Sequence, residues 1–178
     1  MQTKQFTKES GQAGLKILLI ISILIFITSY AIVFLLNVQK KTRDSERMTT
    51  ITSLQKAIDL YYDAFSKWPA GDNDGDGWDE GFHSENDRRF IQPLVDHKFL
   101  PSSVSDPVFY GAKSFKYAVY EPGFAGCPRA KGSFYVLGIT EMESDTRPPK
   151  EFTGSGFSCA KRDWGKEFDY VVGKFTNE

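Results

Sequence analysis

The residues best suited to chemistry form an acidic segment near the middle of the chain. Residues 71–80 read Gly-Asp-Asn-Asp-Gly-Asp-Gly-Trp-Asp-Glu. Alternate carboxylates can converge on one side of a tight turn, and oxygen atoms are the ligands that Ca²⁺ takes in proteins. The glycine after the third alternate Asp permits a sharp turn, and the next carbonyl is placed as a backbone ligand. The sequence therefore predicts a calcium site with the ligands Asp72, Asp74, Asp76, Trp78 and Glu80.

The match to an EF-hand calcium loop fails at its last ligand. The twelfth position is His83 where the EF-hand loop has a bidentate Glu, and Glu80 or Glu85 can substitute for it. Without a cation, this many neighbouring carboxylates would repel one another. A solvated acidic turn is the alternative interpretation.

Two cysteines, Cys127 and Cys159, lie in loop sequence that contains glycine. In a domain outside the cytoplasm such a pair favours a disulfide, which would stabilise the fold by roughly 3 to 4 kcal/mol. A structural zinc site normally needs four closely spaced ligands, and these two thiols have no histidine near them in sequence. We therefore expect a disulfide and no zinc site.

Motifs that would indicate an enzyme are missing from the sequence. His83 and His97 are the only histidines. Neither lies in a Gly-x-Ser-x-Gly turn, a His-Glu-x-x-His helix or a phosphate-binding glycine loop. We predict that the protein has no catalytic residues and is not an enzyme.

The loops above depend on a long helical segment at the N-terminus. The run from Ile17 to Leu36 has no charged residue, and a helix of about 20 residues crosses a hydrocarbon core about 30 Å thick. A cleavable signal would have a shorter apolar region followed by small residues. We predict a cytoplasmic leader with little regular structure at 1–16 and a transmembrane helix at 17–37.

An amphipathic pattern continues this helix over residues 38–68. No Gly or Pro interrupts residues 17–67, and Pro69 then ends the helix because its ring removes a backbone donor. Apolar side chains recur at steps of three and four, which places them on one stripe of a helix. The stripe consists of Met48, Ile51, Leu54, Ile58, Tyr61, Tyr62 and Phe65.

Residues 69–178 are predicted to form one head domain with a small sheet. Side chains of alternating character at 115–119 and 134–139 are typical of strands. A run of aromatic and β-branched residues at 168–175 is typical of a third strand. A short helix is capped by residues 84–87 or begins at Pro93. We expect an α+β fold in which the long N-terminal helix packs against a small antiparallel sheet.

Charge distinguishes between possible partners. The net charge of −1 and the mixed charges of the head argue against a nucleic-acid-binding surface. The basic residues Lys40, Lys41, Arg43 and Arg47 follow the span, where we expect them to contact lipid phosphates. Basic residues flank both ends of the span, so the positive-inside rule does not decide its orientation. The expected disulfide and acidic loop favour an extracytoplasmic head on a single-pass protein of the cytoplasmic membrane.

Several of these segments together resemble the type IV pilin-like proteins. The apolar span merges into a helix that reads Arg43-Asp44, then Leu-Gln-Lys-Ala-Ile-Asp-Leu-Tyr-Tyr at 54–62, and ends in Trp68-Pro69. This arrangement is most similar to the major pseudopilins of type II secretion systems. Segments 90–100, 106–107, 115–120 and 134–141 are similar in order to that family's second helix, Asp-Pro loop and sheet.

The resemblance implies a pilin-like fold and a structural role. Such a protein is a subunit of a type IV pilus or a type II secretion-type filament, either in the cytoplasmic membrane or in a filament at the cell surface. It contacts like subunits or other pilins through its N-terminal helix. The resemblance also implies that a head loop holds calcium, although the family's loop lies later in the domain than residues 72–80.

The start of the span departs from the family pattern. The family has Gly, then an aromatic residue or Met, and a Glu at the fifth mature position, whereas Gly14 is followed here by Leu-Lys-Ile-Leu-Leu. The alternative is therefore an anchored extracytoplasmic calcium-binding adhesion or binding protein that does not assemble. Neither interpretation predicts a small-molecule substrate.

Overall fold

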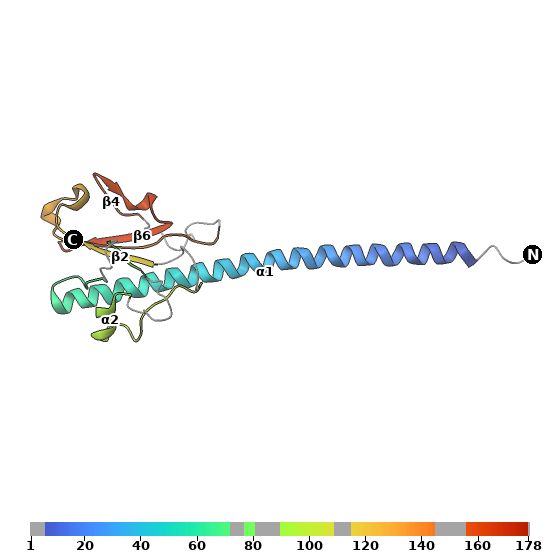
Figure 1. The fold of residues 1–178 in the computed structure, drawn as a ribbon, viewed down its shortest axis with the longest axis horizontal. Coiled ribbons are helices and arrows are strands. Elements are labelled where there is room, and N and C mark those ends of the chain that lie inside the picture. Colours follow the sequence, from blue (N-terminus) through green and yellow to red (C-terminus); the bar gives the residue numbers. More distant parts are fainter. Residues whose placement is uncertain (1–5, 72–76, 81–89, 109–114, 145–155, 178) are drawn as a thin grey trace, which may run out of the picture. The chain divides into compact units, whose positions relative to one another are not determined.

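The chain divides into two compact units, Met1–Lys40 and Lys41–Glu178. The computed structural model describes residues 6–71, 77–80, 90–108, 115–144 and 156–177, and describes side chains from Gly14 onward. Helix α1 (Phe6–Phe65) belongs to both units, and all described strands belong to the second. Figure 1 shows these elements along the chain.

The first unit is helical from Phe6 onward, so the expectation of little regular structure is wrong for residues 6–16, and residues 1–5 lie outside the described part of the chain. This helix is long and apolar enough to cross a membrane. Side chains at 15–36 are exposed, as expected for a segment whose neighbours are lipids. The hydroxyls of Ser22, Thr28 and Ser29 donate to carbonyls of the preceding turn, so these three hydroxyls are satisfied within the helix.

In the second unit, residues 41–65 of α1 bury the predicted stripe. Met48, Ile51, Leu54, Ile58 and Tyr61 are buried, whereas Phe65 at the end of the stripe is 40% exposed. The helix ends at Phe65, three residues before the expected Trp68. It ends there because Ser66 adopts a left-handed conformation with φ of +53°. Pro69 therefore follows the helix end rather than causing it.

A four-stranded antiparallel sheet forms the centre of the second unit (Figure 1). Its order is β1 (Asp79–Glu80), β2 (Phe115–Tyr120), β3 (Phe134–Ile139) and β6 (Tyr170–Phe175). The central strand β3 pairs with both long neighbours, since Leu137 lies between Tyr117 and Val172. The expected α+β layout of one long helix and a small antiparallel sheet is thus confirmed.

Shorter elements complete the second unit. Helix α2 (Gln92–Asp96) has Pro93 in its first turn, which matches the second of the two predicted starts. A hairpin of β4 (Ser158–Cys159) and β5 (Arg162–Asp163) follows the long connection after β3. Short 3₁₀ turns lie at Phe124–Gly126, Arg129–Lys131 and Trp164–Lys166.

Both faces of β3 are buried, which the expectation of one covered face did not include. One face packs with the α1 stripe and α2, through residues such as Leu54, Leu94 and Leu137. The other face packs with a second cluster that contains Phe134, Val136 and Trp164. The sheet is therefore the middle layer of the head, between α1 and an outer layer formed by residues 156–168.

Two strand glycines make this outer layer possible. A Cβ atom on Gly173 would lie 2.6 Å from the ring of Phe157, and one on Gly138 would lie 2.7 Å from the ring of Phe168. A side chain at either position would displace an aromatic ring from the sheet. These glycines admit the two rings and so bring the outer layer close to the strands.

Candidate functional site

The most unusual feature of the head is a buried group of charges near the start of the second unit. We call Arg43, Asp44, Arg47, Asp106 and Glu143 the Arg47 cluster. Arg47 and Asp44 are fully buried, and Asp106 is 6% exposed. Charged side chains are seldom buried unless they are paired. Their partners therefore determine what this site does.

Arg47 is held by three carboxylates from three segments. Its Nε and Nη2 atoms donate to the two oxygens of Asp106, each at 2.8 Å. Its Nη1 donates to Asp44 Oδ1 at 2.7 Å and lies 3.0 Å from Glu143 Oε1. A bidentate guanidinium–carboxylate pair has a defined geometry, so Arg47 fixes the position of the Asp106 segment against α1.

The other members of the Arg47 cluster tie the segment after β3 to α1. Arg43 Nε donates to Glu143 Oε1 at 2.9 Å, and Arg43 Nη2 donates to the other oxygen. Asp44 accepts the backbone N–H groups of Glu143 at 3.0 Å and Ser144 at 2.7 Å. Asp44 thus satisfies backbone donors that would otherwise be buried without partners.

The electrostatics of the Arg47 cluster favour fixed charges. Burial opposes the charge of Arg47, but the surrounding carboxylates outweigh it and raise the pKa of the guanidinium. The hydrogen bond from Arg43 is the main reason that the pKa of Glu143 falls to about 2. Burial alone would raise the pKa of Asp44, but backbone donors and Arg47 lower it. Because these groups stay charged at neutral pH, they are poorly suited to proton transfer and well suited to positioning.

This geometry corrects the interpretation of the basic residues after the span. Arg47 is inside the head, so it is not available for the expected contact with lipid phosphates, whereas Arg43 is paired with Glu143 and its side chain is 30% exposed. Lys40 and Lys41 are exposed. Sequence reasoning used Arg43-Asp44 and Asp106-Pro107 as motifs and missed that Arg43 pairs with Glu143 and that Arg47 pairs with Asp106. A regular pattern does not reveal such pairs, which lie 59 or more residues apart.

The predicted calcium ligands are only partly within the described residues. Asp72, Asp74 and Asp76 lie outside them. Gly77 has φ of +87°, the left-handed conformation that the predicted turn requires. Among the described residues, no group of three or more His, Cys, Asp or Glu side chains is placed to hold a metal.

The described end of the acidic segment is tied to the sheet and to α2. The ring of Trp78 packs against Phe168, with 5.3 Å between centroids. Glu80 forms an ion pair with Lys116 on β2. Asp79, which was not predicted to matter, is 2% exposed and accepts the Ile91 N–H at 2.8 Å. This end of the segment is therefore anchored by contacts other than a metal.

The predicted disulfide is present. Cys127 and Cys159 are bonded, with 4.9 Å between their Cα atoms and 32 residues between them in sequence. The bond links the connection between β2 and β3 to the β4–β5 hairpin. It thereby fastens the outer layer to the sheet.

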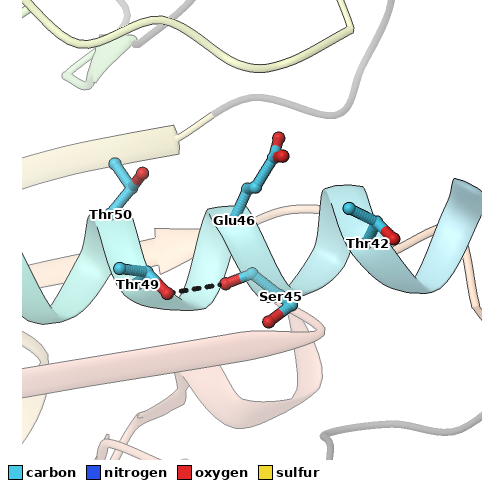
Figure 2. Close-up of a pocket in the computed structure, with 5 residues that line it drawn as sticks. All are labelled: Thr42, Ser45, Glu46, Thr49 and Thr50. Atoms are coloured by element: carbon cyan, nitrogen blue, oxygen red, sulfur yellow. Dashed lines mark hydrogen bonds between the residues drawn. The ribbon is translucent and has the colours of Figure 1, made fainter.

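A shallow hollow of about 420 Å³ lies along the second part of α1. Figure 2 shows its lining side chains, which come from successive turns of the helix. They are Thr42, Ser45, Glu46, Thr49 and Thr50. The Thr49 hydroxyl donates to the Ser45 carbonyl at 3.0 Å, so it is already used within the helix. The hollow offers hydroxyls and one carboxylate, and neither imidazole nor thiol is among these lining residues.

Comparisons of the chain with protein-family models, curated proteins and solved structures gave no match. The assignment of function therefore depends on the chain's own residues.

The Arg47 cluster predicts a large effect of one substitution. Replacing Arg47 with Met leaves buried carboxylates unpaired, which typically costs about 3 to 5 kcal/mol. We expect Arg47→Met to lower the free energy of unfolding by this amount, measured by urea denaturation of the full chain in detergent. Lys166→Met is the control because Lys166 pairs with Asp163 but is 83% exposed, so its effect should stay within about 0.5 kcal/mol. Asp106→Asn is the milder variant if Arg47→Met does not fold. Equal effects of the Asp106 and Lys166 variants would contradict a positioning role.

The Arg47 cluster also predicts that the stability of the head depends on pH through Glu143. Folding lowers the pKa of Glu143 from 4.5 to about 2, so its contribution to stability is complete above pH 4.5 and is lost as the pH falls toward 2. We expect stability to decrease across this range, and to decrease less steeply in Glu143→Gln, which has no proton to gain. Denaturation curves at several pH values measure both slopes. Glu46→Gln, on the exposed side of α1, should keep the slope of the unmodified chain. A Glu143→Gln slope as steep as the unmodified one would disprove the assignment.

Proposed function

We propose that the chain is a membrane-anchored, pilin-like structural subunit of a type IV pilus or type II secretion-type filament. The observation that carries this proposal is that the two parts of α1 have different surroundings. Its first part exposes apolar side chains and carries no charged residue from Ile17 to Leu36, and its second part buries a stripe beneath an antiparallel sheet. In this proposal the span lies in the cytoplasmic membrane, with the N-terminus inside and the head outside.

The contacts of the head support a structural role. The Arg47 cluster joins α1 to the segments at 106–108 and 141–144 by charged hydrogen bonds. A subunit that is held by its N-terminal helix in a filament needs its head to stay fixed to that helix. The disulfide is consistent with an oxidising, extracytoplasmic location.

The main alternative is an anchored binding protein that does not assemble. It is favoured by the absence of an acidic residue from the span, since the family uses a Glu there during assembly. The two proposals share the membrane anchor and the head. They differ in whether spans of neighbouring chains pack together.

Cross-linking within the membrane tests assembly. We expect Phe26→Cys to form covalent dimers when isolated membranes are oxidised, because packed spans bring equivalent positions together. Phe26 is suitable because it is 77% exposed. The yield should not fall when the membranes are diluted by fusion with added lipid, since random collisions alone would become rarer. Lys166→Cys, at a head side chain that is 83% exposed, is the control for contacts outside the membrane. Monomers, or dimers that disappear on dilution, would favour the non-assembling alternative.

We further propose that residues 72–80 hold Ca²⁺, with Asp72, Asp74, Asp76, Trp78 and Glu80 as ligands. Support comes from the alternation of carboxylates and from the left-handed Gly77. Because Glu80 is paired with Lys116, it would have to exchange that partner for the ion.

Chelation tests the calcium proposal. We expect a chelator to lower the melting temperature of the full chain, since a ligand that binds only the folded state stabilises it. Asp74→Ala should abolish this difference. Asp96→Ala, a substitution of an exposed Asp on α2, should leave it unchanged. A melting temperature that is the same with chelator and with added Ca²⁺ would contradict the calcium proposal.

A further inference from the structure

The disulfide joins two loops that together form an exposed surface. We call residues 121–131 and 158–163 the disulfide-linked tip. The Lys161 N–H donates to the Ala125 carbonyl at 2.9 Å, so a backbone hydrogen bond joins the loops in addition to Cys127–Cys159. Two 3₁₀ turns shape the first loop. The tip is thus held in one conformation before any ligand arrives, which reduces the entropy cost of binding.

An aromatic side chain stands at the surface of the disulfide-linked tip. Phe124 is 42% exposed although it is one of the larger apolar side chains of the head. One face of its ring stacks on Tyr120, with 4.3 Å between centroids and 15° between planes. This contact fixes the ring and leaves the rest of it accessible. An aromatic ring fixed in this way suits stacking against a flat ligand.

Two cationic side chains lie over the glycines on either side of Phe124 in sequence. A Cβ atom on Gly123 would lie 2.8 Å from Arg129 Nε, so the Arg129 side chain lies over Gly123. The Lys161 side chain lies similarly over Gly126. Both cations are exposed, and neither side chain forms an ion pair or hydrogen bond within the part of the chain that the structure describes. By contrast, Lys116, Arg162, Lys166 and Lys174 all have carboxylate partners.

We propose that the disulfide-linked tip binds an anionic polysaccharide. A pyranose ring can place its C–H face on Phe124 while its carboxylate or sulfate pairs with Arg129 or Lys161, and Arg suits such planar anions. An acidic peptide would satisfy the cations but has less need of the exposed ring. A single-stranded nucleic acid would favour several stacking platforms along a basic groove. This inference is independent of whether the chain assembles into filaments.

Binding of the full chain in detergent to polygalacturonate tests the proposal. We expect Arg129→Gln with Lys161→Gln to weaken binding about tenfold or more, which equals about 1.4 kcal/mol. Phe124→Ala should weaken it about three- to tenfold, as expected for loss of one aromatic contact. The double variant Lys166→Gln with Lys174→Gln removes the same charge from lysines that are already paired. It should change binding by no more than about twofold.

Polyglutamate is the matched probe for charge alone. We expect it to bind more weakly than polygalacturonate and to be insensitive to Phe124→Ala. Equal binding of the two polymers, or a Phe124 variant that behaves like the unmodified chain with both, would overturn the polysaccharide proposal in favour of a general acidic partner. No effect of the Arg129 and Lys161 changes would exclude the tip as the binding surface.

Discussion

The structure of the head depends on the need to pair Arg47. A fully buried guanidinium would destabilise the fold by several kcal/mol if it had no partners, because its hydration is lost. Asp44, Asp106 and Glu143 must therefore all reach it, and they come from α1, from the segment before β2 and from the segment after β3. A shift of α1 by one turn would separate Arg47 from Asp106 and Glu143, so the Arg47 cluster sets the register of α1 within the head.

Unlike the charged hydrogen bonds of the Arg47 cluster, the apolar contacts of the core tolerate more than one arrangement of the packed elements. The α1 stripe can be covered by any apolar surface of suitable shape, and the hydrophobic effect does not depend on direction. Specific shape enters through the sheet, where Gly138 and Gly173 admit the rings of Phe168 and Phe157. The disulfide then holds the outer layer that these rings belong to. The head thus combines a non-directional core with directional charges and a covalent link.

The proposed functions use different parts of this architecture. Membrane anchoring and assembly would use the first part of α1, where the Thr28 and Ser29 hydroxyls are satisfied within the helix. Calcium binding would use the acidic segment, whose end at Trp78 packs on the outer layer. Polysaccharide binding would use the disulfide-linked tip. The hydrogen bonds of the Arg47 cluster join α1 to Asp106, Glu143 and Ser144, which fits a group that keeps the second part of α1 and the head together.

The sequence by itself determined the features that repeat or that have few alternatives. The apolar run and the stripe from Met48 to Tyr61 follow helical periods, the three long strands follow β patterns, and two cysteines can pair in only one way. Only the tertiary structure decided that Arg47 lies inside, that α1 ends at Phe65 and that the sheet has two covered faces. The physical reason is the distance in sequence over which each kind of interaction acts. Backbone periodicity acts between neighbours in sequence, whereas an ion pair between Arg47 and Asp106, 59 residues apart, leaves no periodic trace in the chain.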